Sequence, residues 1–475
     1  MVVGNLNKPK SRAVFVCQQC GKESPKWLGR CPGCQEWNSF VETIVAVSSQ
    51  SATWMYSEEN APSELSRLKT ESYPRLSFPV TELNRVLGGG LVLGSLVLIG
   101  GDPGIGKSTL LLQASSVLAE RGGKVVYVSG EESAQQIKLR SERLGVSGDR
   151  LYILPETNLE AILGRLEELS PNLVVVDSIQ TVYIEALAGT PGSVGQIREC
   201  TLRLMRWAKR AGVPVLITGH VTKDGAIAGP RVLEHIVDVV LYLEGETFSS
   251  YRILRSTKNR FGSTNEVGVF EMSGGGLIEV ANPSEAFLAS HRDGVVGSAV
   301  VSTFEGSRPL LVEIQALTSL TGFGPPRRVA NGVDFNRLLL IAAVLSRRAG
   351  VNLSNQDIIT NVIGGMRVGE PAADLGMALA IASSHRDARI APGLVVLGEV
   401  GLSGELRAVP QPERRIAEAA RLGFKRCLVP QASAKLPSGA KGIEILKAGT
   451  LSEALRLGLV RPAKKSAHLA EESHV

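Results

Sequence analysis

The feature that most restricts the fold of this chain is a glycine-rich loop between an apolar run and a helical segment. Residues 101–108 read GDPGIGKS, which matches the pattern G-x-x-x-x-G-K-[ST]. The run SLVLIG at 95–100 comes directly before the loop, and apolar residues at helical spacing follow it at 108–121. This order of strand, tight turn and helix predicts the first unit of an α/β sheet domain.

The residue types of the loop indicate phosphate binding. Glycines let backbone N–H groups converge on phosphate oxygens, and the helix N-terminus adds its positive end. Lys107 reaches the β- and γ-phosphates, and Ser108 can hold Mg²⁺. A chance glycine turn is the alternative, and the flanking strand and helix argue against it. The predicted nucleotide-binding residues are Gly101, Asp102, Pro103, Gly104, Ile105, Gly106, Lys107, Ser108 and Thr109.

Further β-branched runs predict the rest of a mainly parallel sheet. They lie at 124–129, 172–177 and 213–219, separated by helical segments such as 196–212 that are long enough for crossovers. The runs at 237–243 and 251–258 are expected as extra strands.

Acidic residues at two strand ends are candidates for catalysis. Asp177 ends a buried run, where a carboxylate orients Mg²⁺ through water; a strand-capping aspartate is the alternative. Glu131 and Glu132 follow another run, where one can polarise the attacking water and one can open the next helix. We assign the catalytic role to Glu131.

Four of the six cysteines form the pattern C-x2-C-x10-C-x2-C, which predicts a structural Zn²⁺ site. A redox dithiol needs only one pair, and disulfides are rare in the cytosol. Six basic and three acidic residues leave this ribbon at +3 before the thiolates are counted. Trp27 and Trp37 can stack on bases or a protein, or pack around the ribbon. Cys200 and Cys427 are expected as buried apolar residues. The predicted metal ligands are Cys17, Cys20, Cys31 and Cys34.

The length of 475 residues and an apolar content of 44% predict several packed domains. The longest apolar stretch, 91–100, is too short to cross a membrane, and the N-terminus has no pattern of a secretion signal, so we expect a cytoplasmic protein. A net charge of +6 permits a polyanionic partner. The expected domains are a ribbon at 1–45, a linker at 46–77, an ATPase-like α/β domain at 78–283, an α+β domain at 284–460 and a polar tail at 461–475.

Several motifs occur together that resemble the RadA (Sms) family of bacterial DNA-repair proteins. They are the four-cysteine ribbon, GDPGIGKST, VVVDS, ITGHVTKDG at 217–225 and KNRFG at 258–262. The central block resembles the RecA-type ATPase core. The resemblance implies a DNA-stimulated ATPase in a hexameric ring around single-stranded or branched DNA. It also implies branch migration and extension of strand exchange beside the RecA recombinase, with ATP, Mg²⁺ and Zn²⁺ bound.

The resemblance also implies roles for residues outside the loop. His220 is similar to a sensor of the γ-phosphate, and Lys258 and Arg260 would reach the nucleotide of a neighbouring subunit. From the residues alone, KNRFG is equally well a solvated basic turn. The segments 181–197 and 221–233 resemble loops that line the pore of such a ring, although ordinary flexible loops are the alternative. Their glycines and cations are Gly192, Gly195, Lys223, Gly225, Gly229 and Arg231.

The C-terminal region resembles the Lon protease domain through 369–383 and 397–409. We expect strands at 296–303, 310–317 and 395–400, and helices at 334–349 and 371–384. Ala372 and Glu413 stand where that family has its serine and lysine, so we expect an inactive protease domain used for assembly or DNA contact. Arg327–Arg328 and Arg347–Arg348 suit DNA contact and a solvated surface equally. An ATP-dependent peptidase and a nucleotide-switched scaffold are the competing functions.

Overall fold

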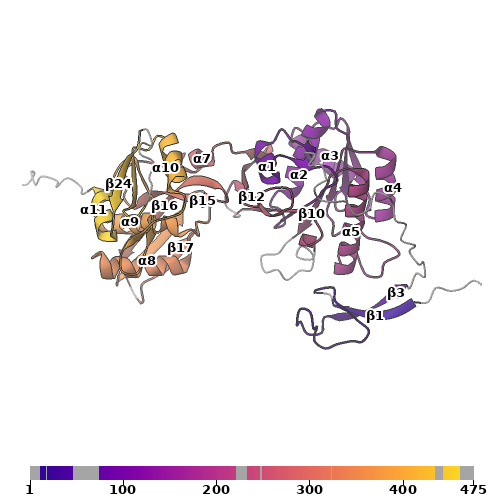
Figure 1. The fold of residues 1–475 in the computed structure, drawn as a ribbon, viewed down its shortest axis with the longest axis horizontal. Coiled ribbons are helices and arrows are strands. Elements are labelled where there is room, and N and C mark those ends of the chain that lie inside the picture. The colour runs from indigo at the N-terminus through magenta and orange to yellow at the C-terminus, as the bar shows by residue number, and fades with distance from the viewer. Residues whose placement is uncertain are drawn as a thin grey trace, which may run out of the picture. The chain divides into compact units, whose positions relative to one another are not determined.

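The computed structural model describes residues 11–17, 19–46, 74–220, 233–245, 249–322, 324–433 and 442–460 (Figure 1). The chain packs as two compact units, one of Met1–Glu244 with Arg252–Glu279 and one of Gly245–Tyr251 with Val280–Val475. Most of the expected linker, the expected tail and most of the segment 221–233 lie outside the described residues, among them Lys223, Gly225, Gly229 and Arg231.

The N-terminal ribbon is a small antiparallel sheet with the order β2-β1-β3. Its strands are β1 (Ser11–Cys17), β2 (Glu23–Ser24) and β3 (Phe40–Ala46). The buried apolar cluster described there consists of Cys17, Cys31 and Phe40, with Phe15 and Leu28 packed against it. Among the ribbon side chains that the structure describes, this cluster is too small to offset the conformational entropy of folding, and a metal ion bound at the cysteines would supply the missing stability.

The first unit is built around a nine-stranded sheet with the order β14-β13-β12-β11-β6-β10-β9-β7-β8. The strands from β11 to β8 run parallel, and β12 pairs antiparallel with β11. In chain order they are β6 (Leu96–Gly101), β7 (Val125–Ser129), β8 (Leu151–Pro155), β9 (Leu173–Asp177), β10 (Val215–His220), β11 (Val239–Glu244), β12 (Tyr251–Asn259), β13 (Val267–Ser273) and β14 (Gly276–Glu279). A separate pair is β4 (Arg75–Leu76) with β5 (Leu91–Val92).

Helices cover both faces of this sheet, as the continuous burial of its central strands β6, β7 and β9 requires. Val97 and Ile99 of β6 pack with α1, α2 and α3 on one face, and Leu96 and Leu98 pack with α4 and α5 on the other. These helices are α1 (Thr81–Leu87), α2 (Lys107–Glu120), α3 (Ala134–Arg143), α4 (Leu159–Leu169) and α5 (Val194–Ala211). The predicted parallel α/β core is therefore confirmed, while the last residues of the expected loop 181–197, including Gly195, belong to α5.

The second unit contains a mixed seven-stranded sheet with the order β17-β18-β16-β15-β20-β23-β24. Its strands are β15 (Ser298–Glu305), β16 (Arg308–Leu320), β17 (Arg328–Asn331), β18 (Gln356–Val362), β20 (Leu394–Val396), β23 (Arg426–Pro430) and β24 (Glu444–Ala448). Two short pairs flank it: β19 (Arg389–Ile390) with β25 (Leu459–Val460), and β21 (Glu399–Val400) with β22 (Leu406–Arg407). The helices are α7 (Pro283–Phe287), α8 (Phe335–Arg348), η3 (Pro371–Ala373), α9 (Asp374–Arg386), α10 (Pro412–Arg421) and α11 (Leu451–Gly458).

One predicted strand of the second unit is wrong. The run at 395–400 does not form a single strand, because β20 ends at Val396 and β21 begins at Glu399 in a different sheet. Gly398 lies between them, and its N–H donates to the Ala372 carbonyl at 2.9 Å. A Cβ at Gly398 would lie 3.0 Å from Pro430, so the chain turns where only a small residue fits.

Across the described part of the chain, every helix falls short of the length and apolar character that a bilayer crossing requires.

Candidate functional site

The glycine-rich loop joins β6 to α2 and contains three glycines with positive φ, of which Gly101 and Gly106 are closely confined by their neighbours. Gly101 has φ 150° and Gly106 has φ 116°. A Cβ at Gly101 would lie 2.5 Å from the Leu243 carbonyl oxygen, and one at Gly106 would lie 2.7 Å from Met272 Cε. Gly106 is also the N-cap of α2 and provides no side-chain cap, so the first-turn N–H groups face the loop. This is the geometry that binds an anion at a helix N-terminus.

Lys107 is buried within the loop, with only 5% of its surface exposed. Its Nζ donates to the carbonyl oxygens of Gly101 at 2.9 Å and Asp102 at 3.0 Å. Burial lowers the pKa of this ammonium, and the charges of Asp177, Asp102 and Glu131 act in the opposite direction. The three carboxylates therefore keep a cation beside the anion-binding turn.

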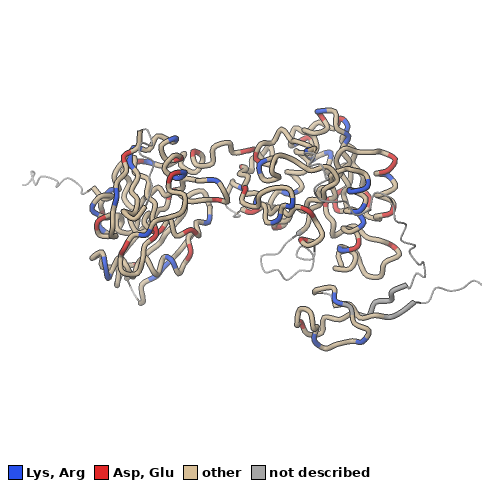
Figure 2. Tube along the Cα trace, in the orientation of Figure 1, with Lys and Arg blue, Asp and Glu red and all other residues tan. Residues whose placement is uncertain are grey.

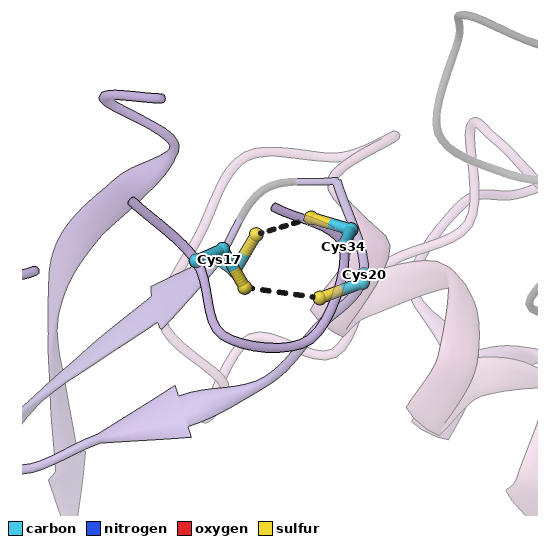
Figure 3. A group of neighbouring side chains, drawn as sticks. Cys17, Cys20 and Cys34 are labelled. Atoms are coloured by element: carbon cyan, nitrogen blue, oxygen red, sulfur yellow. Dashed lines mark hydrogen bonds between the residues drawn. The ribbon is translucent and has the colours of Figure 1, made fainter. Parts of the chain in front are cut away.

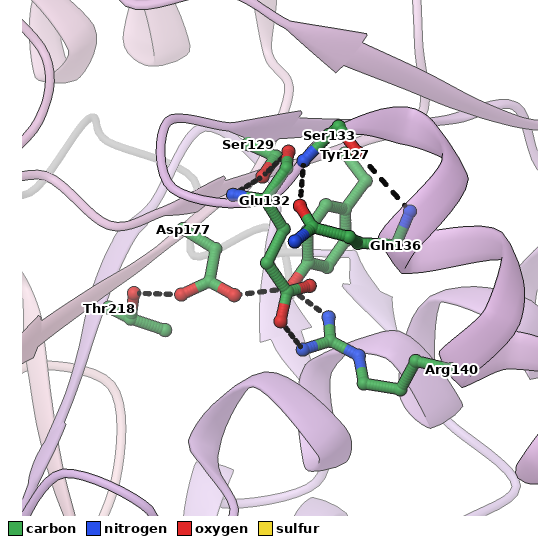
Figure 4. A network of polar contacts seen from close by, with 8 residues as sticks. All are labelled: Tyr127, Ser129, Glu132, Ser133, Gln136, Arg140, Asp177 and Thr218. Atoms are coloured by element: carbon green, nitrogen blue, oxygen red, sulfur yellow. Dashed lines mark hydrogen bonds and ion pairs between the residues drawn. The ribbon is translucent and has the colours of Figure 1, made fainter.

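Asp177 ends β9, and hydrogen bonds from two neighbouring strands fix its carboxylate (Figure 4). The Tyr127 hydroxyl donates to Oδ2 at 2.5 Å, and the Thr218 hydroxyl donates to Oδ1 at 2.6 Å. Burial and the charge of Asp177 raise the pKa of Tyr127 well above its ordinary value. The phenol therefore remains protonated and keeps donating to the carboxylate.

The two adjacent glutamates have different partners. Glu132 forms an ion pair with Arg140 at 2.8 Å, and its backbone N–H donates to the Ser129 hydroxyl at 3.1 Å. Glu131 instead accepts a hydrogen bond at 2.6 Å from Ser178, the residue after Asp177. The expectation that one glutamate opens the next helix is wrong. Both precede α3, whose N-cap is Ser133 in a capping box with Gln136, because that pair satisfies the first-turn N–H groups.

The order of the strands brings these groups to one edge of the sheet. Strand β10 lies between β6 and β9, and its last residue, His220, is in register with Gly101. The His220 side chain is outside what the structure describes. The loop, Asp177 and Glu131 all follow the carboxyl ends of parallel strands, where ligands bind in open α/β sheets.

Lys258 and Arg260 lie at the opposite edge of the sheet. Asn259 pairs with Val239, which pairs with Val97 at the start of β6, whereas the loop begins at Gly101. Four residues of strand separate Val97 from Gly101, a distance of about 13 Å. The structure therefore does not bring Lys258 and Arg260 to the loop of their own chain.

Both basic residues are bonded within their own unit. Lys258 Nζ donates to the carbonyl oxygens of Glu234 at 2.6 Å and Val237 at 2.8 Å, while Arg260 pairs with buried Asp238 at 3.0 Å. Burial, with a smaller effect from Arg260, lowers the pKa of Lys258. Lys258 thus holds the segment that directly follows 221–232.

Sequence reasoning missed three polar residues of this region. Tyr127 and Thr218 hold Asp177, and Arg252 Nε donates to the Ile105 carbonyl within the loop at 3.3 Å. The available signal for Tyr127 and Thr218 was a hydroxyl inside an otherwise apolar buried strand, which requires a partner there.

The four predicted cysteine ligands converge on one point of the ribbon. Figure 3 shows the sulfurs of the labelled Cys17, Cys20 and Cys34 turned toward one another. All four sulfurs lie within 4.8 Å of each other, with 3.6 Å between Cys17 and Cys34 and 3.5 Å between Cys20 and Cys31. Tetrahedral Zn–S bonds of about 2.3 Å separate sulfurs by about 3.8 Å, so the cluster fits Zn²⁺. Burial opposes charge on Cys17, yet a hydrogen bond with Ser39 and backbone hydrogen bonds lower the pKa of its thiol to about 6.

In the second unit, neither of the two positions that correspond to the catalytic serine and lysine of the Lon family holds that residue. Ala372 is buried in η3, and Glu413 is in the first turn of α10. Glu370, two residues before Ala372, forms an ion pair with Arg415, two residues after Glu413, and the arginine is fully buried. Ser383 is also buried, where it donates to the Ala388 carbonyl at 2.5 Å.

Comparisons with known proteins agree with this architecture. Residues 61–226 match the family model described as AAA domain, 15–42 match the rubredoxin metal binding domain, and 334–433 match subunit ChlI of Mg-chelatase. The chain is 54% identical over 456 residues to DNA repair protein RadA of Halalkalibacterium halodurans, covering 95% of this chain and 100% of the relative. It is 52% identical to RadA of Bacillus subtilis over 454 residues, covering 95% and 99%. The ATPase domain implies ATP and Mg²⁺ as ligands, and the cysteine cluster implies Zn²⁺.

Proposed function

Because the chain belongs to the RadA family of DNA repair proteins, we propose that it is an ATP-driven motor that moves along DNA and processes branched recombination intermediates. It works in the cytoplasm as a hexameric ring, migrates branches and extends strand exchange started by RecA. Its substrates are single-stranded and branched DNA, and DNA stimulates its ATPase.

In this proposal the sheet edge at Gly101 hydrolyses ATP. The loop of residues 101–109 and the N-terminus of α2 bind the phosphates, Lys107 contacts their β- and γ-oxygens, and Ser108 with Asp177 holds Mg²⁺. Glu131 polarises the attacking water, and its hydrogen bond from Ser178 supports this choice over Glu132. Bound Mg²⁺ neutralises charge on the phosphates, and His220 at the end of β10 senses the γ-phosphate.

The observation that supports a ring of subunits is the position of Lys258 and Arg260, which lie at the edge of the sheet opposite the loop at Gly101. Cations about 13 Å along the strand from the loop serve a nucleotide only if it belongs to another subunit. We propose that they exchange their bonds to residues 234–238 for the phosphates of the neighbouring protomer. Since residues 234–238 follow segment 221–232, each exchange moves a pore-lining loop, and the loops step along single-stranded DNA.

The Lon-like domain is proposed to serve assembly or DNA contact without proteolysis. Buried Ala372 has no nucleophile, and the hydroxyl of Ser383 already donates to a backbone carbonyl. The absence of a nucleophile at Ala372 and the hydrogen bond of Ser383 argue against the alternative function of an ATP-dependent peptidase.

A subunit-mixing experiment tests the arrangement in trans. Lys107→Ala and Arg260→Ala variants, each lacking ATPase activity alone, are mixed in equal amounts under conditions that exchange protomers. About a quarter of the interfaces then combine an intact loop with an intact Arg260, so roughly a quarter of wild-type turnover returns. A mixture as inactive as its components, despite demonstrated exchange, contradicts action in trans.

A branched-DNA assay tests the motor. RecA forms a three-strand intermediate, and extension of its heteroduplex is followed with ATP or a non-hydrolysable analogue. Extension that requires hydrolysis supports a motor. Equal extension with both nucleotides, together with an ATPase rate that single-stranded DNA leaves unchanged, identifies a nucleotide-switched scaffold instead.

A further inference from the structure

Two tryptophans of the ribbon lie side by side and expose most of their surface. Trp27 is 53% exposed and Trp37 is 66% exposed, although indole is among the most costly side chains to leave in water. A Cβ built at Gly29 would lie 3.7 Å from the Trp27 ring and 3.9 Å from the Trp37 ring. Both rings therefore border the same glycine and form one aromatic surface, called here the indole pair.

The indole pair is held by the second cysteine knuckle. Arg30 and Trp37 form an antiparallel bridge, and the Asn38 N–H donates to the Gly29 carbonyl at 2.8 Å. The Cys31 N–H donates to the Glu36 carbonyl at 2.8 Å within the same turn. A metal ion at the cysteines thus fixes the backbone that places both rings.

A cation is fixed on the indole pair. The Arg30 guanidinium lies 5.7 Å from the centre of the Trp37 ring. Gln35 keeps it there by accepting hydrogen bonds from Nε at its carbonyl, 2.9 Å, and from Nη2 at its side chain, 2.8 Å. The arginine is thereby ordered before any partner arrives.

The charges around the indole pair favour an anionic partner. Among the ribbon side chains that the structure describes, Lys22, Lys26 and Arg30 are exposed cations and Glu36 is an exposed carboxylate. Lys22 lies against the cysteine site, because a Cβ at Gly33 would touch both its Cδ and Cys20 Sγ. Its charge therefore offsets the thiolates, while Lys26 directly precedes Trp27 in the chain and Arg30 lies over the Trp37 ring. Figure 2 shows basic positions along the loops of the ribbon.

We propose that the indole pair is a stacking site for unpaired bases of single-stranded DNA. Each ring offers a π-face to one base, and Lys26 with Arg30 neutralises the adjoining phosphates. Duplex DNA keeps its bases stacked in the helix and gains nothing from the rings. The site rests on the proposed function, since it assigns a contact for the same DNA, and it lies in the ribbon rather than in the ATPase domain.

The test compares two double variants of the full-length protein, with and without aromatic rings. Trp27→Ala/Trp37→Ala removes the stacking surface, and Trp27→Phe/Trp37→Phe keeps a π-face at both positions. Affinity is measured by fluorescence anisotropy for a labelled 30-nucleotide oligothymidine and for an abasic oligonucleotide of equal length. Zinc content and ATPase activity without DNA verify that the ribbon and the catalytic domain are intact.

Stacking of two bases predicts that the alanine variant binds oligothymidine at least tenfold more weakly than wild type. The phenylalanine variant should stay within about threefold, and all three proteins should bind the abasic strand equally. The slope of affinity against salt should not change, because no phosphate contact is lost.

Several results overturn the proposal. One is an alanine variant that contains zinc and binds oligothymidine as wild type does. Another is such a variant that loses only its affinity for purified RecA, which makes the indole pair a protein-docking surface. A wild-type protein that binds no oligonucleotide at all refutes the proposed function itself, whereas the first two results leave it standing.

Discussion

Replacing Glu370 by glutamine tests the ion pair that occupies the Lon-like domain beside Ala372. Arg415 is fully buried, and its guanidinium donates to the Ser302 carbonyl at 2.8 Å and to Glu370 Oε2 at 3.1 Å. It also lies 4.4 Å from the centre of the Phe304 ring. Glu370 carries the negative charge that this ion pair needs, because the other contacts are carbonyl oxygens and an aromatic ring.

The structure sets the expected size of the effect. Removing one partner of a buried ion pair leaves an uncompensated charge and costs about 3–5 kcal/mol. Glutamine keeps one acceptor oxygen, and the Phe304 N–H, which now donates to Glu370 Oε2 at 2.9 Å, can still use it. We therefore expect the lower limit, a loss of about 3 kcal/mol in the free energy of unfolding of the second unit.

Hydrogen exchange measures this loss within the intact chain. A peptide from β15 should exchange roughly 150-fold faster in Glu370→Gln, since 1.4 kcal/mol is a factor of ten, while a β6 peptide should not change. Glu413→Gln is the matched control, because Glu413 is exposed in the first turn of α10 and a charge at that position contributes less than about 1 kcal/mol. Equal exchange rates of β15 in wild type and Glu370→Gln would refute the reasoning.

Three further predictions concern the nucleotide site and pH. Lys107→Ala should lower ATP turnover at least a hundredfold with an unchanged far-UV circular dichroism spectrum, because the cation at the phosphates is lost; steady-state turnover checks this. Tyr127→Phe removes one of two donors to Asp177 and should cost about 1.5–3 kcal/mol in stability, measured by exchange of β7 amides. The hydrogen bond that His291 Nδ1 donates to the Glu313 carboxylate raises the pKa of His291, and although burial opposes ionisation of Glu313, His291 and two other donors lower its pKa to about 2. The stability that His291 contributes is complete below pH 6.5 and is lost above it, and that of Glu313 is lost as the pH falls below 4.5. The protection factors of β16 amides, which correct for the intrinsic pH dependence of exchange, should therefore be highest between these values, and His291→Gln should remove their fall on the alkaline side.

The sequence predicted the parallel core because that core is encoded locally. Buried strands such as LVVVD are continuous apolar runs, and this one ends in Asp177, which the site uses. The loop could be predicted for the same reason, since strand, glycine turn and helix are adjacent in the chain. Four cysteines with knuckle spacing predicted the metal site, since two such turns bring their sulfurs together.

Contacts between distant strands could not be predicted in this way. Tyr127, Asp177 and Thr218 come from three strands, and their contact depends on β9 pairing with both β7 and β10. The break at Gly398 likewise depends on Ala372 and Pro430, which pack against it from other parts of the chain. A pattern read along one segment contains no information on these partners, because they are set by sheet order.

The position of the KNRFG motif shows how much sheet order adds to a motif. As a sequence, it is a basic turn that suits solvent and a phosphate equally well. The antiparallel pairing of β12 with β11 moves its cations toward the start of β6, away from the loop at the end of that strand. In the proposed ring, a cation that lies far from the loop of its own chain and is bonded to the segment after 221–232 would connect a neighbour's phosphate with that segment. Such a connection is what coupling hydrolysis to movement along a polymer requires, because charge that develops at one subunit must displace a segment of the next.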